Sequence, residues 1–316
     1  MFILILSSLI FMIINNIYIK WFLIEINSIM TIMIINEKIN KMPSIIYFFM
    51  SIFTSLLILM MLIMISFNYM PNYNYMFNFI IQMNLLAKLG IFPFHYWMIN
   101  IYKMLSWNQI FYLSTWSKFI PLMFYWSITN LNNLTIFILL INMMFMSSWA
   151  FKLNNLKMII ACSSINQTSM LLLLLNFNFN TFIYYMIFYY ISFYMLIKIL
   201  NLFKLHNKFN LMMLNYNYKK IIMFMFIMYS MLPPSMFFII KWLFFMNLLL
   251  TKMNLIMLFL MMISNIMMIW NYFLLMEKLM LKFNMKKYSN KKIIFKMLPI
   301  MMLMLNIISI LFFYLI

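Results

Sequence analysis

The sequence predicts an all-α polytopic membrane protein with about 11 transmembrane helices. Of its 316 residues, 68% are hydrophobic and only 8% are charged, and the mean hydropathy is +1.01. A soluble domain is about half apolar and about a quarter charged, so this chain has too few polar residues to cover a water-exposed surface. A transmembrane β-barrel would show alternating strands of about ten residues separated by turn residues, and the sequence has one glycine and no such alternation.

The spans follow from the thickness of a bilayer, whose apolar core of about 30 Å requires about 20 helical residues. The N-terminal apolar run has no basic flank or small-residue cleavage site, so it counts as the first span rather than a signal peptide. Charged and Asn-rich segments divide the chain into Phe2 to Ile17, Trp21 to Ile35, Ser44 to Phe67, Met76 to Trp97, Ile110 to Ile128, Leu134 to Phe151, Met158 to Leu175, Thr181 to Leu200, Ile221 to Leu250, Leu255 to Tyr272 and Ile294 to Leu315.

The lysines predict the orientation of these spans. All 22 basic residues are lysine; loops after even-numbered spans carry 16 of them, and loops after odd-numbered spans carry only Lys20 and Lys252. Because basic residues collect on the side that is not translocated, the N-terminus is expected on the basic side and the C-terminus on the opposite side. The net charge of +19 is therefore interpreted as a topology signal, and no nucleic acid partner is expected. The loop from Lys286 to Lys292 also suits contact with anionic phospholipids such as cardiolipin.

Composition indicates the compartment and excludes several kinds of site. Forty-three methionines, with almost no residues that require G or C in their codons, indicate an AT-rich genome that reads AUA as Met, as most animal mitochondria do. The predicted location is therefore the mitochondrial inner membrane, with the N-terminus on the matrix side and the C-terminus facing the intermembrane space. Cys162 is the only cysteine and Gly90 the only glycine, which excludes iron-sulfur clusters, thiolate zinc sites and glycine-rich phosphate loops. No cofactor or metal is expected in this chain.

The charged residues inside the spans are the functional candidates, because each costs roughly 2.5 to 3.5 kcal/mol near the bilayer centre. They are Lys88, Lys118, Lys198, Lys241 and Glu25. Lys198 lies near the end of its span, where its long side chain can reach the interface. For Lys88 and Lys118 the alternative is a purely structural ion pair, which Glu25, as the only acid inside a span, can provide for one lysine.

Prolines predict two discontinuous helices, one near Pro93 and one near Pro233 and Pro234, because proline removes a helix hydrogen bond and clashes with the preceding turn. The two interrupted spans are five apart and run in opposite directions, which is typical of inverted repeats around an ion path. We therefore expect a first repeat at residues 1–128, a second at 129–275, and a basic loop with a final span at 276–316.

Five motifs in order and spacing resemble one known family, chain 2 of NADH-ubiquinone oxidoreductase, an antiporter-like subunit of mitochondrial respiratory complex I. They are Trp21-Phe-Leu-Ile-Glu25-Ile-Asn, Lys88-Leu-Gly-Ile-Phe-Pro-Phe-His-Tyr-Trp97, Thr115-Trp-Ser-Lys118-Phe-Ile-Pro121, Ala161-Cys-Ser-Ser-Ile165 and Leu232-Pro-Pro-Ser-Met-Phe-Phe-Ile-Ile-Lys241-Trp242. The resemblance implies a core membrane-arm subunit that contributes to proton translocation, coupled to electron transfer from NADH to ubiquinone. It also implies that NADH, flavin, iron-sulfur clusters and ubiquinone belong to other subunits, and that the partners are further membrane-arm subunits.

The resemblance further implies a proton relay in which Glu25 pairs with Lys88, Lys118 is the central group and Lys241 serves the second half. Where the family usually has a histidine, this chain has Gln167, which cannot exchange a proton near neutral pH. Water held by Asn166, Gln167 and Thr168 is the expected replacement.

Two further hypotheses remain open at this point. One is a stand-alone cation/proton antiporter, and the other is a purely structural linker subunit of the membrane arm.

Overall fold

The computed structural model describes residues 2–36, 41–67, 74–128, 133–177, 179–212, 214, 216–230, 238, 241–243, 245–246 and 255–280. Within these residues every regular element is a helix, apart from an isolated antiparallel bridge between Asn155 and Asn207. The helices belong to two compact units, which comprise residues 1–146 with 160–176, and residues 147–159 with 177–316.

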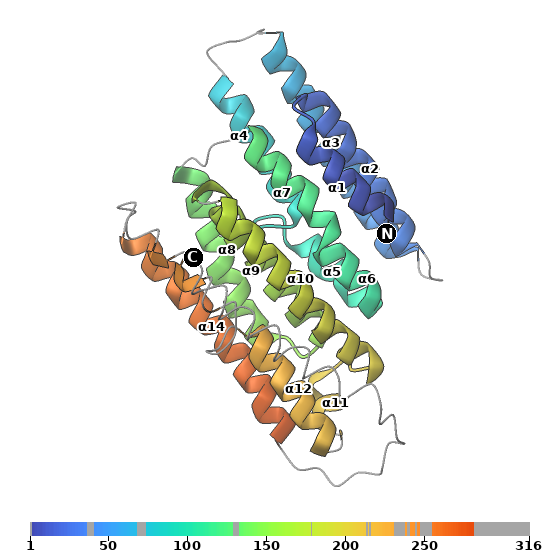
Figure 1. Ribbon diagram of the computed structural model, residues 1–316, viewed down its shortest axis with the longest axis vertical. Helices are drawn as coiled ribbons and strands as arrows, with labels where there is room; N and C mark the ends of the chain where they lie inside the picture. Colours follow the sequence, from blue (N-terminus) through green and yellow to red (C-terminus); the bar gives the residue numbers. More distant parts are fainter. Residues whose placement is uncertain are drawn as a thin grey trace. The chain divides into compact units, whose positions relative to one another are not determined.

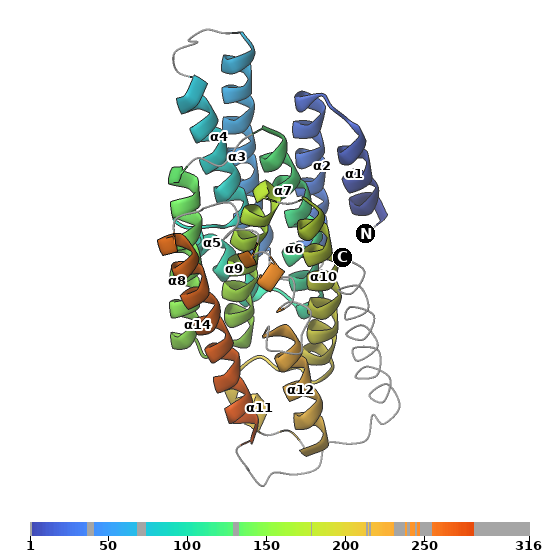
Figure 2. The ribbon, with the colours of Figure 1, turned by 60° about the vertical axis from the view of Figure 1, so that its left-hand side comes forward.

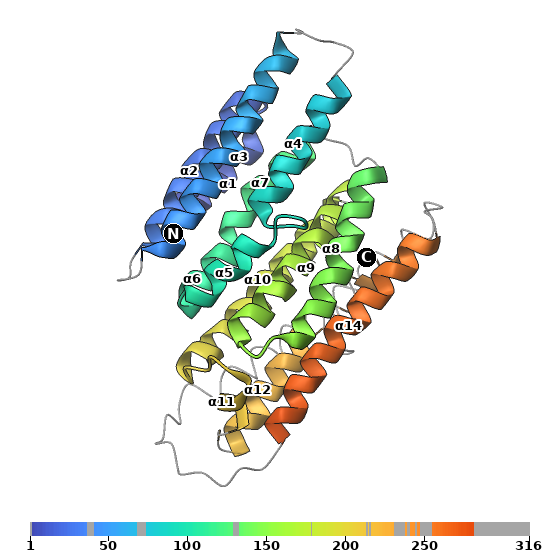
Figure 3. The ribbon, with the colours of Figure 1, turned by 180° about the vertical axis from the view of Figure 1, so that it is seen from behind.

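The first unit contains α1 to α7 and most of α8 and α9 (Figure 1). Their bounds are α1 Phe2–Ile13, α2 Ile17–Ile35, α3 Met42–Ser66, α4 Asn74–Leu89, α5 Tyr96–Met104, α6 Trp107–Ser114, α7 Trp116–Ile128, α8 Asn133–Lys152 and α9 Leu156–Phe177. Helix α2 packs against α1, α3, α6 and α7, and α4 packs against α3 and α7. Figure 3 shows α1, α2 and α3 side by side.

The second unit contains α10 Phe179–Leu202, α11 Lys208–Met212, α12 Tyr216–Tyr229 and α14 Leu255–Met280, together with the adjoining ends of α8 and α9. Helix α12 packs between α10 and α14, as Figure 2 shows. The rings of Phe193, Tyr229 and Tyr272 form a continuous contact across these three helices, with centroid separations of 5.7 and 5.5 Å.

Six described helices are long and apolar enough to cross a membrane: α2, α3, α8, α9, α10 and α14. The chain is therefore an all-α multi-pass membrane protein. Two predicted spans are each divided into two shorter helices, α4 with α5 and α6 with α7. Lys103, which the sequence placed in a loop, lies in the last turn of α5. The final predicted span and the proline pair Pro233 and Pro234 lie outside the described residues.

The interruption predicted near Pro93 separates α4 from α5. The single glycine, Gly90, follows the last residue of α4 with a φ of +69°, a conformation that L side chains rarely adopt. The N–H of Gly90 donates to Ala87 O (3.1 Å) and that of Ile91 to Leu86 O (2.9 Å), the hydrogen-bond pair of a Schellman cap. Asn142 Oδ1 on α8 accepts the N–H of Phe92 at 2.9 Å. The N–H groups of Gly90, Ile91 and Phe92 thus have partners, as a lipid environment requires.

Loops after even-numbered predicted spans meet within each unit. In the first, Gln109 Nε2 at the start of α6 donates to the last carbonyls of α2, Ile34 O (2.9 Å) and Ile35 O (3.1 Å). In the second, the bridge between Asn155 and Asn207 joins the loop after α8 to the loop after α10. Segments at the ends of even-numbered predicted spans are therefore joined within each unit.

Candidate functional site

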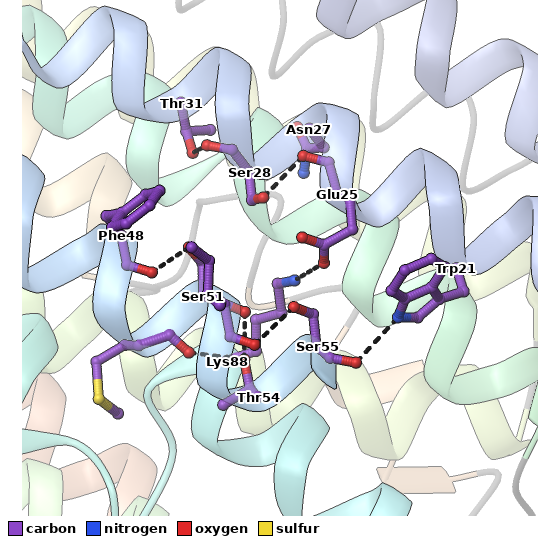
Figure 4. A network of polar contacts seen from close by, with 12 residues as sticks. Trp21, Glu25, Asn27, Ser28, Thr31, Phe48, Ser51, Thr54, Ser55 and Lys88 are labelled. Atoms are coloured by element: carbon purple, nitrogen blue, oxygen red, sulfur yellow. Dashed lines mark hydrogen bonds and ion pairs between the residues drawn. The ribbon is translucent and has the colours of Figure 1, made fainter. Parts of the chain in front are cut away.

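Glu25 and Lys88 form a partly buried ion pair inside the first unit. Lys88 Nζ lies 3.2 Å from Glu25 Oε1, and the side chains are 5% and 20% exposed. Glu25 lies in the middle of α2, and Lys88 projects toward it from α4 (Figure 4). It is the one ion pair among the described residues. The structure thus places Glu25, the only acid inside a predicted span, beside Lys88.

The end of α4 supports the charge of Lys88. Lys88 occupies the last turn of this helix, next to the Gly90 cap. The C-terminal end of a helix carries partial negative charge and stabilises a nearby cation. Across from it, Ser51, Thr54 and Ser55 of α3 each donate to a carbonyl of their own helix. Ser55 O also accepts the indole N–H of Trp21 at 3.0 Å, so polar groups of α2, α3 and α4 surround the pair (Figure 4).

Lys118 has a different environment in the same unit. It is the third residue of α7 and is 3% exposed. Its Nζ lies 3.4 Å from Ser164 O and 3.5 Å from Ser164 Oγ on α9. The Ser164 hydroxyl donates to Ala161 O and lies 3.1 Å from the hydroxyl of Tyr102. In the described part of the chain, no carboxylate pairs with Lys118.

The three residues expected to support water follow Ser164 on α9 by two to four positions, which is within about one helical turn. Asn166, Gln167 and Thr168 are all buried, and the Thr168 hydroxyl donates to Ile165 O at 2.7 Å. Asn166 Oδ1 has no hydrogen-bond partner among the described residues. The α9 residue that contacts Lys118 is thus Ser164, which sequence reasoning did not single out although it lies within a quoted motif.

Lys241 lies in the second unit, where its amine donates to Asn265 Oδ1 on α14 at 2.6 Å. Both side chains are buried, at 6% and 8% exposure. The Nδ2 of Asn265 has no partner within the described residues. Sequence reasoning missed Asn265. The available signal was an amide in the middle of an apolar helix, but the sequence contains many asparagines and does not distinguish this one.

Lys198 differs from the other lysines of the spans. Its side chain is exposed, and its Nζ lies 4.4 Å from the ring centroid of Tyr194, a cation–π distance. The amine of Lys198 thus lies on the outside of α10 beside an aromatic ring, unlike the buried amines of Lys88, Lys118 and Lys241. The described residues contain no group of three or more His, Cys, Asp or Glu side chains placed to hold a metal ion.

Comparison with known proteins shows the family to which this chain belongs. No family model matches the chain. NADH-ubiquinone oxidoreductase chain 2 of Apis mellifera ligustica is 38% identical over 275 residues, covering 86% of this chain and 82% of the relative. The protein of the same name from Anopheles gambiae is 29% identical over 244 residues, covering 74% of this chain and 71% of the relative.

Solved structures share the fold. A chain of an archaeal respiratory membrane complex, the membrane-bound sulfane sulfur reductase, superposes with a TM-score of 0.83 at 15% identity, covering 99% of this chain and 73% of that one. A chain of respiratory complex I from Thermus thermophilus gives a TM-score of 0.79 at 13% identity, covering 92% and 73%. These identities show the fold alone, whereas the 38% identity over most of both sequences shows the family: the chain belongs to the NADH-ubiquinone oxidoreductase chain 2 family.

Proposed function

We propose that this chain is a core membrane-arm subunit of respiratory complex I that contributes to proton translocation across the mitochondrial inner membrane. The observation that carries the proposal is the arrangement of the first unit, in which a partly buried Glu25–Lys88 ion pair and a second buried amine, Lys118, occupy neighbouring helices of one compact fold. Buried ionisable groups in spans mark ion and proton pathways.

The proposed mechanism uses changes in the charge of the pair. While Glu25 is ionised it compensates the positive charge of Lys88 across 3.2 Å. Protonation of Glu25, or its movement away from Lys88, removes this compensation and changes the electrostatic field at Lys118. Lys118 then loads a proton from the matrix side and later releases it, and Lys241 is the corresponding proton carrier of the second half. Other subunits carry out the reaction of NADH with ubiquinone through their own cofactors, and this chain holds no redox centre.

The finer architecture belongs to the same proposal. The chain has 11 spans, of which the first ten form two inverted repeats at residues 1–128 and 129–275, with the N-terminus on the matrix side. Other membrane-arm subunits and phospholipids, including cardiolipin at the basic loop, are its partners, and nucleic acid is not. The likeness to complex I in fold and the family membership support this assignment.

The substitution Lys118→Met tests the function, because it removes the amine and keeps an unbranched apolar side chain. Assembly should be preserved, since no acid loses its partner. Proton pumping driven by NADH oxidation, measured in sealed inner-membrane vesicles, should fall by about tenfold or more, as expected for loss of a positioned proton carrier. Native gel electrophoresis measures assembly in the same preparation.

Lys198→Met is the matched control, because Lys198 is exposed and stacks on Tyr194, and it should leave pumping unchanged. Undiminished pumping by an assembled Lys118→Met complex would refute the relay and favour the purely structural subunit. Cation exchange by the purified chain in liposomes would instead favour the stand-alone antiporter.

A further inference from the structure

The helix that carries Lys118 contains a backbone carbonyl without its usual donor. Pro121 lies inside α7. In an α-helix each carbonyl accepts the N–H of the residue four positions later, and proline has no N–H. The carbonyl that Pro121 leaves without this donor belongs to Ser117, the residue immediately before Lys118.

Asn27 of α2 supplies a donor to this carbonyl. Its Nδ2 lies 3.1 Å from Ser117 O, although the two residues are 90 positions apart in sequence. Asn27 is 2% exposed, and its Oδ1 has no partner among the described residues. Within the described part of the chain, the hydrogen bonding of this amide therefore consists of the contact with α7.

The start of α7 makes this contact important for Lys118. Helix α6 ends at Ser114, and Thr115 has φ −113° and ψ −84°, outside helical values. The N–H of Lys118 donates to Thr115 O at 3.2 Å, only three residues back. Lys118 therefore lies between two irregularities, because α6 ends before it and Pro121 removes one helix hydrogen bond after it. The bond from Asn27 fixes the backbone at the position between these two irregularities.

Asn27 lies two residues after Glu25 on the same helix (Figure 4). Residues two apart on an α-helix point in different directions, so α2 directs Glu25 toward α4 and Asn27 toward α7. We infer that Asn27 is a positioning residue for proton transfer, which ties the backbone of Lys118 to the helix of Glu25 through the Ser117 carbonyl that Pro121 leaves open. This inference rests on the proposed function.

The test is a cycle of variants at Asn27 and Pro121 in the assembled complex. Asn27→Leu removes the donor and leaves the Ser117 carbonyl buried, so protons pumped per NADH oxidised should fall by about tenfold, because small displacements of a reacting group cost up to about 100-fold. The pH profile of pumping should also shift. Pro121→Ala restores an N–H four residues after Ser117, so this variant alone should pump as the parent does.

The double variant Asn27→Leu/Pro121→Ala should regain most of the pumping, because the helix then satisfies Ser117 without Asn27. Asn176→Leu is the matched control, since Asn176 Nδ2 donates to Leu172 O of its own helix, and it should leave both pumping and its pH profile unchanged. If Asn27→Leu alone does not assemble, the double variant must restore assembly.

Three results would overturn the inference: unchanged pumping in assembled Asn27→Leu, a double variant no better than Asn27→Leu, or loss of pumping in Pro121→Ala alone. The Lys118→Met variant separates this failure from failure of the proposed function. If Lys118→Met abolishes pumping while Asn27→Leu does not, only the positioning role is lost. If Lys118→Met pumps normally, the relay itself is refuted.

Discussion

Lys88 and Lys118 are buried in the same unit, yet their surroundings are opposite in electrostatic character. Lys88 stands at the C-terminal end of α4, beside the carboxylate of Glu25. Lys118 lies in the first turn of α7, and the N-terminal end of a helix carries partial positive charge. The contacts of its amine are the neutral oxygens of Ser164.

The comparison teaches that burial alone does not define the role of a lysine. Charge on Lys88 is compensated twice, by the acid and by the helix end. Among the described residues Lys118 has no such acid, and it lies at the start of its helix and not at the end, so its charged state should depend more strongly on changes in neighbouring charges. In the proposed function, Lys118 is accordingly the group that binds protons transiently, and the Glu25–Lys88 pair controls the local field.

The largest expected effect follows from breaking the pair. Glu25→Gln leaves Lys88 buried without its acid, and removal of one partner of a buried pair costs about 3 to 5 kcal/mol. The amount of assembled complex and its Tm should both fall sharply. Glu25→Gln/Lys88→Met removes both charges and should recover most of the stability, although not the pumping. Equal stability of the parent and Glu25→Gln would contradict the difference drawn between the two lysines.

A second effect should appear at the helix break beside Lys88. Gly90→Ala forces a left-handed conformation on a residue with a Cβ, at about 1 to 2 kcal/mol. The added atom would lie 2.8 Å from Met98 Cβ, and such overpacking costs about 1 to 3 kcal/mol more. The Tm of the assembled complex should drop, with an altered Lys88 environment reducing pumping as well. A Tm equal to that of the parent would show that the cap tolerates a side chain.

The junction beside Lys118 should tolerate more. Thr115 has a negative φ. Its hydroxyl and its backbone N–H both donate to Phe111 O. Thr115→Ala therefore removes the hydroxyl that donates to Phe111 O without backbone strain, at about 1 kcal/mol. The decrease in Tm should be smaller than for Gly90→Ala measured side by side. A larger decrease would place the more demanding break at α6–α7 instead of α4–α5.

The smallest effect concerns Lys208, a buried lysine in the basic loop region outside the spans. Burial lowers its pKa from the usual 10.5, and the positive charge of Lys278 lowers the pKa further. Because the folded state binds this proton more weakly than the unfolded state, the charged lysine opposes folding below its folded pKa, and the penalty disappears as the pH rises above about 10.5. Lys208→Met should raise the Tm at neutral pH by about 1 °C, since solvent screens such interactions. A lower Tm would mean that the amine has a stabilising partner.

Much of the architecture followed from local sequence features. The apolar runs that predict spans correspond to α2, α3, α8, α9, α10 and α14. The interruption near Pro93 was also predictable, because Gly90 and Pro93 lie together in an otherwise apolar segment. In contrast, the separation of α6 from α7 at Thr115 carried no local signal, since the residues around it are neither glycine nor proline and the nearest proline is six positions later.

The candidate site was predictable only in part. The free-energy cost of placing charges inside the bilayer selected Glu25, Lys88, Lys118 and Lys241 as candidates. The residues alone left open which lysine would pair with Glu25. Only the family resemblance assigned Lys88 to it. Asn27, Ser164 and Asn265 were not selected at all, because asparagine and serine occur throughout this sequence. Their importance depends on which neighbouring helix presents a carbonyl or an amine to them.

The sequence by itself determined the fold class and the identity of the costly charges. Both follow from properties of single segments: a helix in lipid must satisfy its own backbone and present apolar side chains, and a lysine within such a segment is visible without knowledge of its neighbours. The tertiary structure decided the partners of those charges. It places Glu25 beside Lys88, as the family resemblance implied, and it alone showed Ser164 for Lys118 and Asn265 for Lys241. These contacts join residues 63, 46 and 24 positions apart, so they depend on how helices pack and turn relative to one another, which no local pattern specifies.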